Sequence, residues 1–180
     1  MEAFIAWIEK NIMPGANKLA SERHLKAIRD TFMTILPPIF FGGIIAVINS
    51  APVTDDTTNG ILLAWAAFDQ QNALVLGWLN QVTLGFLSLY VCIGITYYLA
   101  KSYEMEVFLP IIISLAGYCM LVIDPQEISF GNVLGQLTYF DGKGILVALF
   151  VSIMTVELYR VLYEHKVGWI KMPDSVPPAL

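Results

Sequence analysis

Four long uncharged stretches dominate the chain, and each is predicted to form one membrane-spanning helix. Crossing the ~30 Å hydrocarbon core of a bilayer takes about 20 mostly apolar residues, so the spacing between charged side chains decides how many spans fit. The clearest stretch lies between Asp30 and Asp55, where 24 successive residues carry no charge. We therefore expect an all-α integral membrane protein whose spans cover about residues 32–50, 79–100, 107–123 and 144–163.

Local features refine three of these spans. Pro37-Pro38 and Gly42-Gly43 predict a kinked and closely packed first helix, because membrane helices tolerate proline and small residues let neighbouring helices approach. The second span is chosen from 31 uncharged residues so that Trp78 and Tyr97-Tyr98 place aromatic rings at the two interfaces. The third span, at 17 residues, is near the lower limit of length and should stand close to the membrane normal.

The segments between and beside the spans are expected to be polar or amphipathic. Residues 51–78 are predicted to form an external loop with a short helix near 61–68, and residues 125–143 a second external loop. Residues 2–13 have the helical spacing of apolar side chains that would let them lie flat on the membrane surface. The chain thus divides into a cytoplasmic amphipathic and basic segment (1–30), a four-span membrane region (31–164) and a cytoplasmic tail (165–180).

Lysine and arginine side chains set the predicted orientation. When four spans are threaded alternately, nine of the ten basic residues fall on one side and only Lys143 falls on the other. A bias of this kind marks the cytoplasmic side of membrane proteins, and three or five spans would break it. Both the N-terminus and the C-terminus are therefore expected in the cytoplasm.

Composition adds several exclusions. Of the 180 residues, 57% are hydrophobic and 14% are charged, which is more apolar than a soluble domain needs to fill its core. The formal net charge of −5 leaves no basic face for a nucleic-acid partner. Cys92 and Cys119 lie far apart in apolar runs, which indicates small hydrophobic side chains and not a disulfide or a metal site. The first residues lack the features of a cleaved leader.

No residue is predicted to be catalytic, cofactor-binding or metal-binding, because the sequence has no phosphate-binding glycine loop, zinc motif or nucleophile elbow. His24 and His165 could each carry a phosphate or respond to pH, but an ordinary interfacial side chain is the favoured interpretation of both. Glu157 and Arg160 have i, i+3 spacing near the cytoplasmic end of the fourth span. An intrahelical ion pair with a snorkelling arginine is favoured for them over a place in a substrate pathway.

Tryptophan and asparagine side chains near the predicted interfaces receive similar interpretations. Membrane anchoring is favoured over sugar stacking for the tryptophans, because amphipathic rings suit the headgroup layer. Asn49 is interpreted as a cap of the first helix in preference to a contact for a polar substrate. The tryptophans are Trp7, Trp65, Trp78 and Trp169.

Four runs of residues, spread over nearly the whole chain, resemble one known family. Together they are similar to the membrane component IIC of the lactose/cellobiose/diacetylchitobiose family of the bacterial phosphotransferase system. The run Met-Pro-Asp-Ser-Val-Pro-Pro at residues 172–178 is the most specific part. The four runs are Lys26–Phe32 leading into Pro37, Leu89–Val91 through Tyr97 to Ala100–Tyr103, Thr155–Arg160, and Ile170–Pro178.

The resemblance implies a multi-pass sugar permease of the bacterial inner membrane. Such a permease takes up a disaccharide while the sugar is phosphorylated by the phosphocysteine of the IIB component, which is supplied in turn by IIA, HPr and enzyme I. Intact members of the family are more than twice this long, and their second half supplies the residues for sugar binding and phosphoryl transfer. The resemblance therefore implies a truncated member whose own enzymatic role is left open, and no catalytic role is carried over to His24 or His165.

Two roles for the chain stay open. It is either the N-terminal portion of such a permease, which acts as scaffold and dimer contact, or a non-transporting membrane partner that regulates a full-length permease. As a scaffold it would form a homodimer or pair with a chain that carries the second half, and it would meet a disaccharide only in the presence of that half. The spacing of Gly85 and Ser88 would suit the helix association that the second role requires. Neither role requires a cofactor, and in both the lipid bilayer is a partner.

Overall fold

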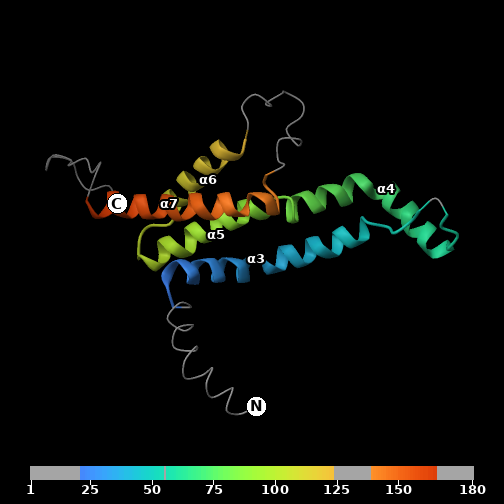
Figure 1. The fold of residues 1–180 in the computed structure, drawn as a ribbon, viewed down its shortest axis with the longest axis horizontal. Coiled ribbons are helices and arrows are strands. Elements are labelled where there is room, and N and C mark those ends of the chain that lie inside the picture. The colour runs from blue at the N-terminus through green and yellow to red at the C-terminus, as the bar shows by residue number, and fades with distance from the viewer. Residues whose placement is uncertain (1–20, 55, 124–138, 166–180) are drawn as a thin grey trace, which may run out of the picture.

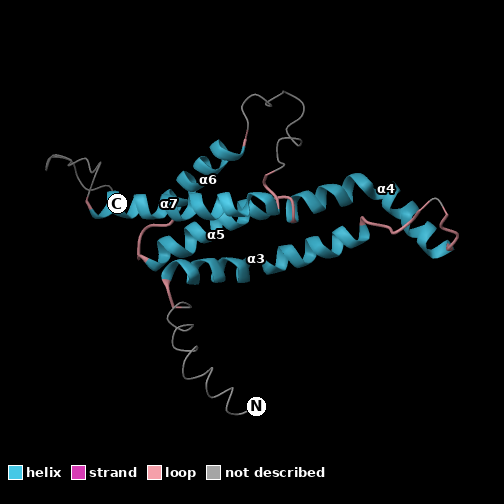
Figure 2. Ribbon diagram, viewed as in Figure 1, coloured by secondary structure: helices cyan, strands magenta, loops and turns pink. Residues whose placement is uncertain are grey.

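The computed structural model describes residues 21–54, 56–123 and 139–165, and this part of the chain is helical without strands (Figure 2). The predicted surface helix at 2–13, most of the predicted loop at 125–143 and the specific run at 172–178 lie outside the described residues. The helices are α3 (Arg23–Ile48), α4 (Gly60–Thr83), α5 (Leu87–Ser102), α6 (Phe108–Val122) and α7 (Ile145–Glu164), with the 3-10 turn η2 (Gly142–Gly144) before α7.

Helix length and apolar character agree with a membrane protein. In the part of the chain that the structure describes, three helical segments are long and apolar enough to cross a bilayer: Arg23–Ile48, Gly60–Ser102 (α4 and α5 taken together) and Gly142–Glu164. The apolar helix α6 is shorter, with 15 residues. At about 1.5 Å per residue it reaches about 22 Å, which is less than the ~30 Å hydrocarbon core.

Helix α5 lies at the centre of the arrangement and packs against α3, α6 and α7. Figure 1 shows α3 running beside α4 and α5 in the opposite direction, while α7 runs alongside α5 in the same direction and α6 is inclined to both. The start of α3 and the ends of α5 and α7 consequently lie at one end of the molecule.

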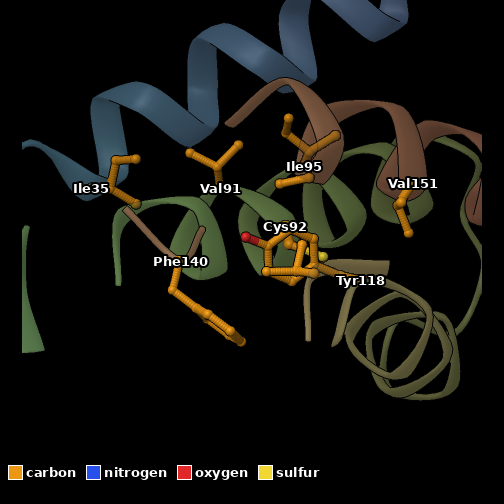
Figure 3. Packing of buried hydrophobic residues seen from close by; sticks show 9 residues of the cluster. Ile35, Val91, Cys92, Ile95, Tyr118, Phe140 and Val151 are labelled. Atoms are coloured by element: carbon orange, nitrogen blue, oxygen red, sulfur yellow. The ribbon is translucent and has the colours of Figure 1, made fainter. Parts of the chain in front are cut away.

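The apolar core is built around one face of α5. Val91, Cys92 and Ile95 are fully buried, and they cluster with Ile35 of α3 and Val151 of α7 (Figure 3). Many large apolar side chains on the outside of the helices are exposed, as expected of surfaces that face lipid. The core therefore holds the helices together, while many other apolar side chains lie outside it on the exposed surface.

Buried hydroxyl groups join the helices through hydrogen bonds. The Oγ of Ser88 lies 2.5 Å from the Oη of Tyr118, and the Oγ1 of Thr96 donates to the Oγ of Ser114 at 3.0 Å. The Oγ of Ser152 lies within 3.1 Å of the carbonyl of Cys92, to which it donates. These bonds connect α5 to α6 and α7 in a setting where an unpaired polar group would be costly.

Two glycines bring α3 close to its neighbours. A Cβ atom at Gly42 would lie 2.5 Å from Oγ1 of Thr83 on α4, and one at Gly94 of α5 would lie 2.5 Å from Cγ2 of Thr31. The prediction of close packing is thus confirmed for Gly42, whereas Gly43 has no neighbour within 4 Å of its hypothetical Cβ. Helix α3 continues through Pro37-Pro38, and Asn49 stands at its C-cap position as predicted.

The second predicted span differs most from the structure. We expected one helix over 79–100 after a loop with a short helix near 61–68, whereas α4 runs for 24 residues and α5 begins only at Leu87. A break in a helix frees the first N–H groups of the following segment. Here the N–H of Ser88 donates to the carbonyl of Phe140 at 2.9 Å, so a distant segment stabilises the interruption at 84–86.

The third and fourth predicted helices lie close to those observed, whereas α3 begins nine residues before the predicted start at 32. The expected segment 144–163 corresponds to α7, and 107–123 corresponds to the shorter α6. The side chain of Trp65, interpreted as an interface anchor, donates from Nε1 to the carbonyl of Ile48 at 2.7 Å and so partners a free carbonyl at the end of α3. Where the bilayer begins and ends along each helix stays a prediction.

Candidate functional site

Charged and aromatic side chains from three elements meet at the end of the molecule where α3 begins and α5 and α7 end. His24 comes from the first turn of α3, Tyr103 follows α5 as its C-cap residue, and Glu157 lies in the second half of α7. We call these residues, together with Glu22 and Arg160, the polar cluster.

Glu157 is the centre of the polar cluster. Its Oε1 accepts a hydrogen bond from the Oη of Tyr103 at 2.5 Å and lies 3.0 Å from Nε2 of His24. Its Oε2 accepts a bond from Nη1 of Arg160 at 3.2 Å. The side chain of Glu157, which is 31% exposed, therefore connects α3, the turn after α5, and α7.

His24 stands between two carboxylates. Its Nδ1 lies 2.8 Å from Oε1 of Glu22, on the opposite side of the ring from the contact with Glu157. A neutral imidazole donates from only one ring nitrogen, whereas a protonated imidazole donates from both. The geometry therefore suits a protonated His24, which would bind both carboxylates at once.

Glu22 has a second role as the N-cap of α3. Its Oε2 accepts hydrogen bonds from the backbone N–H groups of His24 at 2.9 Å and Leu25 at 3.2 Å. The hydrogen bond with the His24 side chain and the bond from the Leu25 N–H lower the pKa of Glu22 from its usual value. The carboxylate is thus kept ionised at the positive end of the helix dipole.

The ring of Tyr103 contacts two guanidinium groups. The Cζ of Arg160 lies 4.7 Å from the ring centroid, and the Cζ of Arg23 lies 5.0 Å from it. Both distances are within the range of cation–π attraction. Burial raises the pKa of the Tyr103 hydroxyl, and its hydrogen bond to Glu157 acts in the same direction, so the hydroxyl stays protonated and donates to Glu157.

The predicted ion pair between Glu157 and Arg160 is present within α7, and Glu157 also contacts residues of other elements. Arg160 also contacts Glu164 through Nε at 3.1 Å, and Glu157 is shared with His24 and Tyr103 from other elements. His24, interpreted as an ordinary interfacial side chain, thus takes part in a contact between helices. His165 stands at the C-cap of α7 with an exposed side chain.

The polar cluster connects helices through ion pairs and hydrogen bonds. Its charged groups are paired with one another, and the donors and acceptors join helices. Among the described residues, no group of three or more His, Cys, Asp or Glu side chains could hold a metal ion. Sequence reasoning missed Tyr103 and Glu22, because neither has a spacing that relates it to Glu157.

Comparison with known proteins decides the family. The family model described as "Phosphotransferase system, EIIC" matches residues 29–180. The chain belongs to this family. The EIIC family consists of membrane transporters, which agrees with the long apolar helices of the structure, and the resemblance deduced from the sequence is confirmed.

Curated EIIC relatives match over the whole chain. The chain is 29% identical to the putative permease IIC component YwbA of Bacillus subtilis, and the match covers 100% of this chain and 41% of the relative. It is also 29% identical to the cellobiose-specific EIIC component of Geobacillus stearothermophilus, again over 100% of this chain and 41% of the relative.

A solved EIIC structure has the same fold. The transporter ChbC, the IIC component of an N,N'-diacetylchitobiose-specific phosphotransferase system, matches with a TM-score of 0.73 and 28% sequence identity. That match covers 96% of this chain and 40% of ChbC. The chain thus spans about two fifths of the length of these EIIC relatives.

Proposed function

We propose that these residues form the N-terminal helical part of an EIIC permease that takes up a disaccharide of the cellobiose, lactose or diacetylchitobiose type. The observation that carries the proposal is the match of the fold to ChbC over 96% of the chain. The cellobiose-specific relative from Geobacillus stearothermophilus supports the same class of sugar. In this proposal the sugar receives its phosphoryl group from the phosphocysteine of a IIB component, which IIA supplies.

Within the permease we assign these helices the role of a scaffold. In the described part of the chain, every buried side-chain nitrogen or oxygen already has a hydrogen-bond partner. A disaccharide that leaves water needs many free donors and acceptors to replace its hydration. Since the buried hydroxyl groups such as Ser88, Thr96 and Ser152 are used between helices, they leave little for a sugar.

We further propose that the scaffold contacts a second chain and sits with both termini in the cytoplasm. Exposed apolar side chains on α3 and α4, such as Phe40 and Leu74, supply a surface suited to lipid or to another copy. The distribution of lysine and arginine supports the orientation, because the start of α3 and the end of α5 carry Arg23, Lys26 and Lys101 at one end of the molecule.

The proposal is tested by reconstitution in liposomes with phosphorylated IIB and radiolabelled cellobiose or diacetylchitobiose. We expect no sugar phosphate to accumulate with this chain alone. We expect accumulation with a chimera in which the chain replaces the matching N-terminal part of the Geobacillus stearothermophilus permease. Vectorial phosphorylation by the chain alone would refute the scaffold role, and a folded but inactive chimera would count against a role in a permease of this type.

A further inference from the structure

A basic pocket lies between the first turns of α3 and the last turns of α5. Its volume is about 320 Å³. It is next to the polar cluster but separate from Glu157, and its lining residue Arg23 contacts the ring of Tyr103 in that cluster. The pocket is lined by Arg23, Lys26, Ala27 and Asp30 of α3 and by Tyr98, Lys101 and Ser102 of α5.

Positive charge exceeds negative charge in this pocket. Arg23, Lys26 and Lys101 line it, and no ion pair within the described residues involves any of the three. The carboxylate of Asp30 also lines the pocket, but it accepts hydrogen bonds from Arg29 at 2.8 and 3.0 Å, and Arg29 is not a lining residue. Within the described residues these three cations are therefore not paired with a carboxylate and are available to an anion.

Aromatic side chains keep two of the cations in place. The Nζ of Lys101 donates to the Oη of Tyr97 at 3.3 Å and lies 5.3 Å from the centroid of that ring. Arg23 lies against Tyr103, as described above. Because their positions are restricted before a ligand arrives, these cations would lose less conformational freedom on binding one.

An apolar surface continues from the pocket along α3. Lys26, Asp30 and Met33 share one face of the helix, because side chains three and four residues apart lie one above the other. Met33, which is 64% exposed, is the first residue of this face beyond the pocket in the direction of the predicted span. A ligand with an anionic head and an apolar tail would match this order of side chains.

We propose that the pocket binds a phosphate group, and that an anionic phospholipid of the surrounding leaflet supplies it. The phosphate lies among Arg23, Lys26 and Lys101, and an acyl chain follows Met33 along α3. Basic pockets between membrane helices are suited to lipid headgroups, and each lysine near the surface adds attraction for anionic lipid. This proposal depends on placement in a membrane but not on sugar transport, so the two can fail independently.

The test titrates the detergent-solubilised full chain with dioleoyl phosphatidylglycerol or dioleoyl phosphatidylcholine and counts retained lipids by native mass spectrometry. We expect the anionic lipid to be retained more tightly. Lys26→Gln and Lys101→Gln should each weaken its retention about fivefold. Lys143→Gln is the matched control, because it removes the same charge outside the pocket from a lysine that contacts Asp141 at 3.9 Å. Circular dichroism verifies that all variants are folded.

Two results would overturn the proposal. Equal retention of the two lipids would show that the phosphatidylglycerol headgroup is not recognised, and equal effects of all three substitutions would show a general charge effect. A further arm adds glycerol 3-phosphate as a soluble competitor. If it displaces the lipid at equal concentration, the phosphate chemistry is supported but the assignment to a lipid is refuted.

Discussion

The contact between Tyr103 and Glu157 should stabilise the fold, since it ties the turn after α5 to α7. The perturbation is a double-mutant cycle made of Tyr103→Phe, Glu157→Ala and the double variant. Tyr103→Phe keeps the ring and its contacts with guanidinium groups but removes the hydroxyl that donates to Oε1 at 2.5 Å. The cycle isolates this one bond from the other contacts of Glu157, namely those with His24 and Arg160.

The size of the effect follows from the type of bond and its exposure. A hydrogen bond to a charged group contributes about 1.5–3 kcal/mol to stability, and solvent reduces the ionic part of this value. Because 31% of the Glu157 side chain is exposed, we expect a coupling free energy of about 1 kcal/mol between the two residues.

The assay is unfolding of the full chain in mild detergent by added dodecyl sulfate, followed by far-ultraviolet circular dichroism. A control cycle pairs Tyr103→Phe with Asp141→Ala, since Asp141 contacts Lys143 and shares no side-chain partner with Tyr103 within the described residues. The control substitutions should be additive within about 0.5 kcal/mol. Additive effects in the Tyr103 and Glu157 cycle as well would refute the bond between helices.

Three further predictions test the packing, each by the same unfolding assay. Gly94→Ala should destabilise the fold by about 1–3 kcal/mol, because its Cβ would meet Thr31. Gly43→Ala is the control and should not destabilise it, because no atom lies within 4 Å of the added Cβ. Equal effects of the two substitutions would contradict the close approach of α3 and α5. Ser88→Ala should cost about 1 kcal/mol through its lost bonds to α6 and to the carbonyl of Phe140, and an unchanged midpoint would argue against them. Trp65→Phe should cost about 0.5–1.5 kcal/mol through the bond to Ile48, and wild-type stability would exclude that cap.

Much of the helical layout could be predicted from the positions of charged residues. The uncharged stretches locate α7 and the end of α3 well. The start of α3 lies nine residues before the predicted start at 32, because the first turns of this helix carry charged residues such as Lys26 and Asp30. The interval 70–100 carries no charge, so it gives no signal for a break. The break depends on the carbonyl of Phe140, which accepts from Ser88 52 residues earlier, and such a contact has no local pattern.

The polar cluster could be predicted only in part for the same reason. The spacing of Glu157 and Arg160 on one helix indicates their ion pair directly. The contact of Glu157 with His24 joins residues 133 positions apart and depends on how α3 and α7 each pack against α5. Family membership could be predicted, because runs such as Lys26–Phe32 and Thr155–Arg160 carry it without knowledge of the packing.

The orientation of the helices in the membrane is the central claim, and cysteine labelling tests it most directly. Cys92→Ala and Cys119→Ala give a cysteine-free chain, into which Glu104→Cys or Lys143→Cys is introduced. In intact cells a membrane-impermeant maleimide should label the cysteine at position 143, whereas the cysteine at position 104 should react only after permeabilisation. Labelling of position 104 in intact cells, or protection of position 143, would contradict the account.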